Sequence, residues 1–213
     1  MSIELRQAIG REEFDYQALM NALSHLANPR EKVTALLRKG VIVRVKKGLY
    51  VFGDAYRRRA ISRELLANWI YGPSLVSLDY ALSYHGLIPE RVPVLTSSTT
   101  KGPKRFETPL GRFVYRQIPT SAFHLGLDRR EVGDVAFLIA TPERALADKV
   151  RDQRKNPLRS LAALATFLFD DLRIDSEAFA QLDASFFETY GGQVGSNKVT
   201  LCAALIRQLR GAR

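Results

Sequence analysis

The stretch Leu36–Phe52, LLRKGVIVRVKKGLYVF, decides how the first part of the chain is interpreted. It opens as the end of a helix, and Gly40 is placed to stop that helix because glycine readily adopts the left-handed conformation that follows a helix end. Two short runs of β-forming residues come next, separated by Lys46-Lys47-Gly48. This pattern predicts a β-hairpin, with Gly48 supplying the positive φ of the corner.

Helical spacing of apolar residues continues upstream of this hairpin. We expect three helices there, over residues 3–9, 15–26 and 29–39. In the third, Val33, Leu36 and Leu37 share one face, which leaves the opposite face for solvent or a partner. Three helices followed by a hairpin is the element order of a winged helix-turn-helix. We therefore predict that residues 1–55 form a DNA-binding domain of this kind.

Positive charge is concentrated in the same region. The whole chain has a formal net charge of +10, and residues 28–63 alone contain eleven lysines and arginines against two acidic residues, a net +9. From residue 158 to the end, six cations balance six acids. A local excess of this size is typical of a surface that binds an anionic partner such as nucleic acid. The alternative is an ordinary helix and hairpin with a solvated basic face.

The DNA-binding hypothesis assigns a role to each outward-facing side chain. Arginine is the usual reader of guanine in the major groove, and a carboxylate accepts from the cytosine amino group. Lysines and arginines around the helix suit phosphates, which set the position of the protein without reading sequence. The candidates for base edges are Glu31, Thr34 and Arg38, and the candidates for phosphates are Lys32, Lys39, Arg44, Lys46 and Lys47.

The rest of the chain predicts a second, α+β domain over residues 56–213. Helices are expected over 58–71 and 77–84, two or three antiparallel strands between residues 92 and 118, and a buried central strand at 135–140, VAFLIA. Thr141 and Pro142 then start another helix, and helices at 158–170, 176–188 and 197–209 form a helical C-terminal part. The predicted fold is therefore a small mixed or antiparallel sheet covered by helices.

Three segments carry a resemblance to a known family. They are Leu36–Phe52, the segment SLVSLDYALSYHGLIPERVPVLTSSTTKGPKRFETPLGRFVYRQIP at 74–119, and IATPERALADKV at 139–150. They resemble the AbiEi-family antitoxins of type IV toxin–antitoxin systems, which are linked to abortive infection and phage defence. The last 60 or so residues match only as a generic helical tail.

The resemblance implies a transcriptional autorepressor that binds inverted repeats in its own promoter through the winged helix. It also implies that the C-terminal domain counteracts a nucleotidyltransferase-like toxin, without a stable complex between the two proteins. No cofactor is implied. The absence of a long apolar run and the single cysteine favour a cytoplasmic protein that does not span a membrane.

A second basic cluster lies further along the chain, at Lys101, Lys104, Arg105, Arg112 and Arg116. Alternation along a strand places Arg112 and Arg116 on one face. The cluster is either the polar side of a half-buried sheet, a contact face for RNA or a nucleotide, or an extension of the DNA footprint.

The sequence shows no established catalytic or metal-binding pattern. The three histidines and one cysteine lack the spacing of a zinc site, and no phosphate-binding loop or nucleophile elbow occurs. Asp134, Glu143 and Lys149 near the buried strand raise the alternative of a metal-dependent nuclease, but the paired acid and lysine of such a site are missing. We expect no catalysis. A further alternative is a toxin-binding protein that uses the winged helix for protein contacts.

Overall fold

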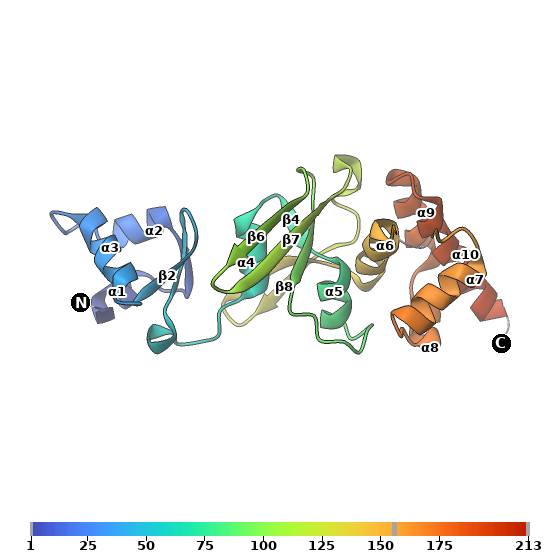
Figure 1. Ribbon diagram of the computed structural model, residues 1–213, viewed down its shortest axis with the longest axis horizontal. Helices are drawn as coiled ribbons and strands as arrows, with labels where there is room; N and C mark the ends of the chain where they lie inside the picture. Colours follow the sequence, from blue (N-terminus) through green and yellow to red (C-terminus); the bar gives the residue numbers. More distant parts are fainter. Residues whose placement is uncertain (1, 155–156, 212–213) are drawn as a thin grey trace.

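The computed structural model of the protein describes residues 2–154 and 157–211, and Figure 1 shows its elements arranged in succession along the long axis. An N-terminal part lies at one end, a six-stranded sheet occupies the middle, and a group of helices forms the other end. Ten α-helices and two sheets are present among the described residues. The predicted mixture of helices and sheets is confirmed.

The N-terminal part contains three helices and a three-stranded antiparallel sheet of order β1-β3-β2. Its elements are α1 (Ser2–Ala8), β1 (Glu13–Asp15), α2 (Tyr16–Ala22), α3 (Pro29–Arg38), β2 (Ile42–Lys46) and β3 (Leu49–Phe52). The short strand β1 was not predicted, and α2 starts and ends inside the range expected. Asp15 begins α2 by accepting a hydrogen bond from the backbone N–H of Ala18 at 2.8 Å. Gly40 and Gly48 have φ values of 67° and 84°, as the predicted helix end and hairpin corner require.

The three-stranded sheet contributes side chains to two hydrophobic cores. Phe14, Ile42 and Phe52 pack with the helices of the N-terminal part. Val45 and Val51 belong instead to the larger core of the rest of the chain. Because successive strand residues point to opposite faces, β3 is buried on both sides. The hairpin is therefore held between the N-terminal helices and the six-stranded sheet.

The six-stranded sheet has the order β6-β7-β5-β4-β9-β8. Its strands are β4 (Ser74–Val76), β5 (Leu95–Thr99), β6 (Lys104–Thr108), β7 (Gly111–Gln117), β8 (Leu127–Val132) and β9 (Val135–Ala140). Strand β9 lies inside the sheet, as predicted for VAFLIA, while β4 and β8 were not predicted. Of the two or three antiparallel strands expected between residues 92 and 118, β6 and β7 do pair antiparallel, but β5 pairs with β7 in parallel, which was not predicted. The β6–β7 hairpin joins the sheet through its second strand, which leaves β6 at the edge.

Helices cover both faces of this sheet. On one face lies α4 (Arg63–Ile70), where the backbone carbonyl of Ala67 accepts a 2.7 Å hydrogen bond from the hydroxyl of Tyr115. On the other face lie α5 (Leu78–Tyr84) and α6 (Pro142–Asp152). The helix expected over 58–71 begins five residues later, because residues 58–62 form a non-helical connection and Ser62 caps α4 by accepting from the N–H of Leu65 at 3.1 Å. Trp69 of α4 is an exposed aromatic residue.

The C-terminal helices pack beyond α6. They are α7 (Leu161–Ala165), continued by a π-helical turn (Thr166–Asp171), then α8 (Ser176–Gln181), α9 (Ala184–Gln193) and α10 (Asn197–Gly211), and short 3₁₀ turns occur at Asp54–Tyr56 and Thr120–Ala122. The single helix expected over 176–188 is two helices, since Asp183 starts α9 by accepting from the N–H of Ser185 at 2.9 Å. Within the described ranges, no helix is long and apolar enough to cross a membrane.

Candidate nucleic-acid interface

The outer face of α3 is polar and open to solvent. Val33 and Leu36 are buried on its inner side, whereas Glu31, Thr34 and Arg38 are exposed. The hydroxyl of Thr34 donates to the carbonyl of Arg30 within the helix, at 3.2 Å. The guanidinium of Arg38 forms no hydrogen bond or ion pair with any residue that the structure describes. The three side chains expected to read bases thus share one accessible surface.

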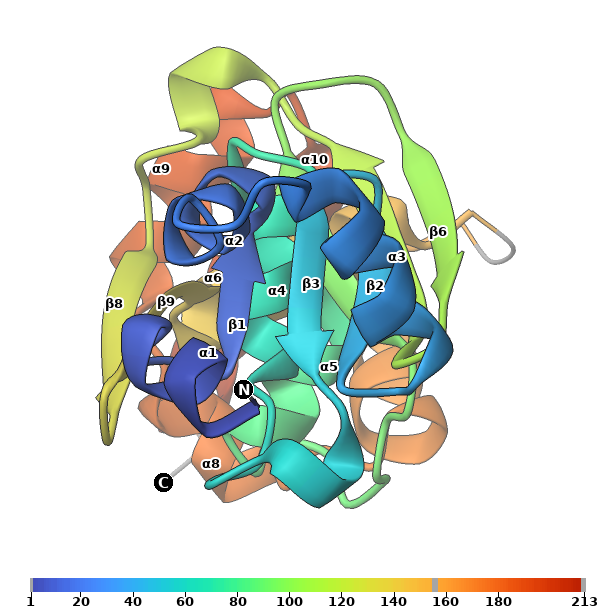
Figure 2. The same ribbon diagram turned by 90° about the vertical axis from the view of Figure 1, so that its left-hand side faces the viewer.

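Three exposed cations lie at the end of α3 and on the hairpin beside it. Lys39 follows the helix, Arg44 is on β2, and Lys47 occupies the β2–β3 turn. In Figure 2, which looks onto the N-terminal part, α3 lies alongside β2. None of the three forms an ion pair within the described ranges. Lys32 of α3 is partly buried and makes a contact of its own.

Lys46 differs from its neighbour Lys47. Its ammonium donates a 2.7 Å hydrogen bond to the backbone carbonyl of Ile70, at the end of α4, and lies 5.2 Å from the centre of the Phe106 ring. A β-bulge between Arg44 and Lys46 accompanies this change of direction. The side chain therefore faces the seam between the hairpin and the six-stranded sheet. The sequence offered no sign of this contact.

The structure divides the second basic cluster between two faces of the sheet. Lys104 pairs with Tyr115 across β6 and β7, while Arg105 pairs with Val114, so the two cations point in opposite directions. Lys101 and Lys104 lie 5.4 and 5.6 Å from the Tyr71 ring, on the side of α4.

The remaining arginines of the cluster make ion pairs elsewhere. Arg112 pairs with exposed Glu107 at 2.6 Å, and Arg116 pairs with Asp152 of α6 at 2.9 Å. Arg105 is exposed. Alternation correctly placed Arg112 and Arg116 together, but the sheet is not half-buried at this strand, because Phe113, Val114 and Tyr115 are all buried.

One aromatic ring joins the two basic regions. The ammonium groups of Lys46 and Lys104 lie 5.2 and 5.4 Å from the centre of the same Phe106 ring. A cation over a ring face is stabilised by the ring quadrupole without being neutralised. Lys101 and Lys104 therefore continue the basic surface of the hairpin, whereas Arg112 and Arg116 do not.

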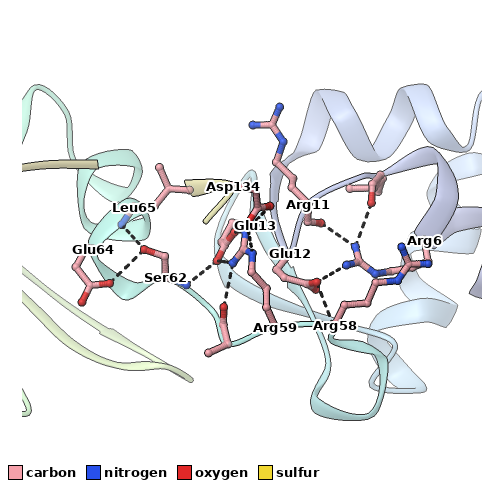
Figure 3. A network of polar contacts seen from close by, with 12 residues as sticks. Arg6, Arg11, Glu12, Glu13, Arg58, Arg59, Ser62, Glu64, Leu65 and Asp134 are labelled. Atoms are coloured by element: carbon pink, nitrogen blue, oxygen red, sulfur yellow. Dashed lines mark hydrogen bonds and ion pairs between the residues drawn. The ribbon is translucent and has the colours of Figure 1, made fainter. Parts of the chain in front are cut away.

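A polar network fixes how the N-terminal part sits on the six-stranded sheet (Figure 3). Arg59, in the connection before α4, donates to both carboxylate oxygens of Glu13 at 2.9 and 2.7 Å and pairs with Asp134 at 2.7 Å. The backbone N–H of Ser62 also donates to Glu13, at 2.6 Å. The hydrogen bond to Glu13 raises the pKa of Arg59, and Arg59 lowers the pKa of Asp134.

Several arginines of the basic segment 28–63 form ion pairs or hydrogen bonds within the protein. Arg57 pairs with Asp54 and donates to the carbonyl of Phe52 at 2.9 Å, and Arg63 donates to the carbonyl of Pro93 at 2.6 Å. Together with Arg59, these arginines hold the connection between the two parts of the chain. In the sequence they belong to the same local charge excess, and only the folded structure separates them from the exposed cations of α3 and the hairpin.

A buried charged network lies on the opposite side of the sheet. Asp148 of α6 accepts hydrogen bonds from Ser77 at 2.7 Å and Ser98 at 2.6 Å, pairs with Arg144 at 3.0 Å, and also accepts from the hydroxyl of Tyr190. Burial, followed by the charge of Asp148, raises the pKa of Tyr190. Arg144 and Asp148 are four residues apart in one helix, and this spacing is the only sequence signal for the pair.

The residues of the nuclease alternative do not meet. Asp134 pairs with Arg59, Glu143 accepts from the N–H of Asp183 at 3.4 Å, and Lys149 pairs with Asp79 at 2.5 Å. No group of three or more histidine, cysteine or acidic side chains suited to a metal ion occurs among the described residues.

No protein-family model matches the chain, and no curated protein matches it.

Proposed function

We propose that the protein is a DNA-binding transcriptional autorepressor and antitoxin of a toxin–antitoxin operon, acting in the cytoplasm. Residues 1–55 would be a winged helix-turn-helix and residues 56–213 the antitoxin domain. The order α1-β1-α2-α3-β2-β3, with a three-stranded sheet of order β1-β3-β2, supports the first assignment because it is the order of elements in winged helices. In this arrangement α3 enters the major groove and the β2–β3 hairpin is the wing.

The observation that carries the proposal is the open outer face of α3. A recognition helix must bury one side in its own domain and leave the other free for base edges, as α3 does with Leu36 and Arg38. Arg38, Thr34 and Glu31 are the proposed base-reading residues.

Phosphate contacts are assigned to the cations around this face, which are Lys32, Lys39, Arg44, Lys46 and Lys47. Lysines and arginines that neutralise phosphates release bound cations from DNA, and this release supplies most of the non-specific affinity. Lys39, Arg44 and Lys47 are the strongest candidates, since they are exposed and form no ion pair with a described residue. Lys46 retains donors beyond the one that it directs to Ile70.

The antitoxin role rests on the family resemblance. Two of the three resembling segments correspond to β4, α5 and β5–β7, and to β9 and α6, which are neighbours in the six-stranded sheet and its covering helices. The resemblance therefore follows one connected structural unit rather than scattered segments. On this proposal the unit counteracts a nucleotidyltransferase-like toxin, without requiring a stable complex.

Two experiments test the two roles separately. The full chain should retard a duplex from the region upstream of its own gene, in preference to a scrambled duplex of equal length and composition. It should also restore growth when expressed with the neighbouring gene. Absence of a preference for the upstream duplex would refute autorepression, and unrelieved toxicity, or a neighbouring gene that is not toxic, would refute the antitoxin role.

A further inference from the structure

A large polar cleft opens on the side of the molecule away from the N-terminal part. It has a volume of about 950 Å³ and lies between the end of β7, the end of α6 and the start of α10. Clefts that bind small molecules usually have volumes of about 300–1,000 Å³, so this one has room for a ligand much larger than a single phosphate ion. In Figure 1, the six-stranded sheet lies between α3 on one side and α6 and α10 on the other.

Cations from three elements line this cleft. They are Arg116 of β7, Arg151 of α6, Arg154 just after α6, and Lys198 of α10. Asp152 is the only acidic residue in the described lining. Four positive charges against one negative charge leave a net +3 in a single concave surface.

The protein neutralises few of these charges itself. Asp152 is already paired with Arg116 at 2.9 Å. Within the described ranges, Arg151 and Lys198 donate only to backbone carbonyls, of Gln117 at 3.0 Å and Gln153 at 2.5 Å. Arg154 is exposed and forms no ion pair with a described residue. Hydrogen bonds to neutral carbonyls leave a full positive charge available to an anion.

The electrostatic environment of Lys198 shows that these groups influence one another. Burial lowers the pKa of Lys198, nearby Asp152 raises it, and the charges of Arg151 and Arg154 lower it again. A bound anion would relieve this repulsion. The start of α10, with Gly195 and Ser196 in the cleft lining, adds the partial positive charge of a helix N-terminus.

We propose that this cleft binds the phosphate chain of a nucleoside triphosphate, with Arg116, Arg151, Arg154 and Lys198 as the phosphate-binding residues. Arginine and lysine differ usefully here, because the guanidinium binds two phosphate oxygens at once while the ammonium acts as a compact charge. Inorganic triphosphate carries the same chemistry and should occupy the same residues.

The lining favours a free nucleotide over a nucleic-acid strand. Proteins that bind single strands combine a basic groove with aromatic rings on which bases stack. The described lining of this cleft contains no aromatic residue. Recognition must therefore come from the phosphates, and we expect little selectivity among the four bases. The inference does not depend on DNA binding by α3.

Isothermal titration of the full chain at low salt tests the proposal, with ATP, GTP, inorganic triphosphate, AMP and a uridine dodecamer as titrants. Arg154→Glu reverses one cation of the cleft, and Lys198→Met removes another while keeping the length of the side chain. Arg159→Glu is the matched control, because Arg159 is an exposed arginine outside the cleft. Circular dichroism and thermal melting establish that each variant is folded.

ATP, GTP and inorganic triphosphate should bind one site with similar affinity and displace one another, and AMP should bind more weakly. Arg154→Glu and Lys198→Met should each weaken ATP binding about tenfold or more, as expected for loss of a charge-assisted hydrogen bond. Arg159→Glu should change the affinity for ATP less than about twofold, and Arg154→Glu should leave binding to the upstream duplex unchanged.

The proposal is overturned if ATP and triphosphate show no saturable binding. It is also overturned if cleft and control variants behave alike, or if the dodecamer binds more tightly than ATP.

Discussion

Arg59 holds Glu13 through two parallel hydrogen bonds, from Nη1 to Oε1 at 2.9 Å and from Nη2 to Oε2 at 2.7 Å (Figure 3). Glu13 is a fully buried residue of the edge strand β1, and Arg59 lies in the connection that leads to α4. The same guanidinium reaches Asp134 in the β8–β9 turn. One side chain therefore links the N-terminal part to the six-stranded sheet and helps set the direction in which α3 faces.

Replacing Arg59 by alanine should lower the free energy of unfolding by about 3 kcal/mol, because it leaves a buried carboxylate without its cation. In this variant, the backbone N–H of Ser62 would still donate a hydrogen bond to Glu13. Urea denaturation followed by circular dichroism measures the change.

Asp134→Ala is the matched control, since it removes the other partner of the same arginine. Asp134 is exposed, and exposed ion pairs contribute little to stability. This variant should unfold close to the wild type. Equal losses from the two substitutions would show that the buried bond to Glu13 does not hold the junction.

Arg38→Ala should relax the preference for one base pair of the operator. Loss of a bidentate contact to a base costs about 1–3 kcal/mol of discrimination, while affinity for a scrambled duplex should fall only slightly. Competition titrations with operators mutated at single positions provide the measurement. A uniform loss of affinity on all duplexes would instead assign Arg38 to a phosphate.

Lys104→Ala should weaken DNA binding if the basic surface continues past the hairpin, because Lys104 shares the Phe106 ring with Lys46. The slope of log K against log salt should become less steep by about 0.9, the effect of one phosphate contact. Arg112→Ala removes the same charge from the other face of the sheet, where Arg112 pairs with Glu107. Its slope should match that of the wild type, and equal effects of the two variants would contradict the division between faces.

Tyr115 should make the protein sensitive to alkali. Burial raises the pKa of its hydroxyl, so the folded state holds this proton more tightly than the unfolded chain does. The resulting stability is fully present below the unfolded tyrosine pKa of about 10 and is lost as the pH rises above it.

Tyr115→Phe removes this titration together with the hydrogen bond to Ala67. At neutral pH it should cost about 1 kcal/mol, and above pH about 10 its stability should fall less steeply than that of the wild type, by up to about 1.4 kcal/mol per pH unit. Urea denaturation across this pH range tests both effects. Parallel curves for the two proteins would exclude Tyr115 as the titrating group.

Local patterns predicted much of the N-terminal part. Helical spacing located α3, and Gly40 and Gly48 marked a helix end and a hairpin corner, because each of these features depends on residues close together in the chain. The exposed positions of Arg38 and Lys47 followed from the same local geometry.

Long-range contacts could not be predicted in this way. The parallel pairing of β5 with β7 and the contact between Lys46 and Ile70 join residues whose spacing carries no periodic signal. Three of the buried partners of Asp148 come from β5, α9 and the residue before α5, so only the folded chain brings them together. For the same reason, the role of Arg59 at the junction could not be predicted.

The salt dependence of binding to the upstream duplex tests the central claim most directly. A variant with Lys39, Arg44 and Lys47 all changed to alanine should lose affinity, and its slope of log K against log salt should be less steep by about 2.7, or 0.9 for each phosphate contact. A second variant, with Arg129, Arg159 and Arg207 changed to alanine, removes the same charge from other exposed positions and should keep the wild-type slope. Equal slopes for the first variant and the wild type, or no binding by the wild type, would contradict a DNA-binding surface at α3 and the hairpin.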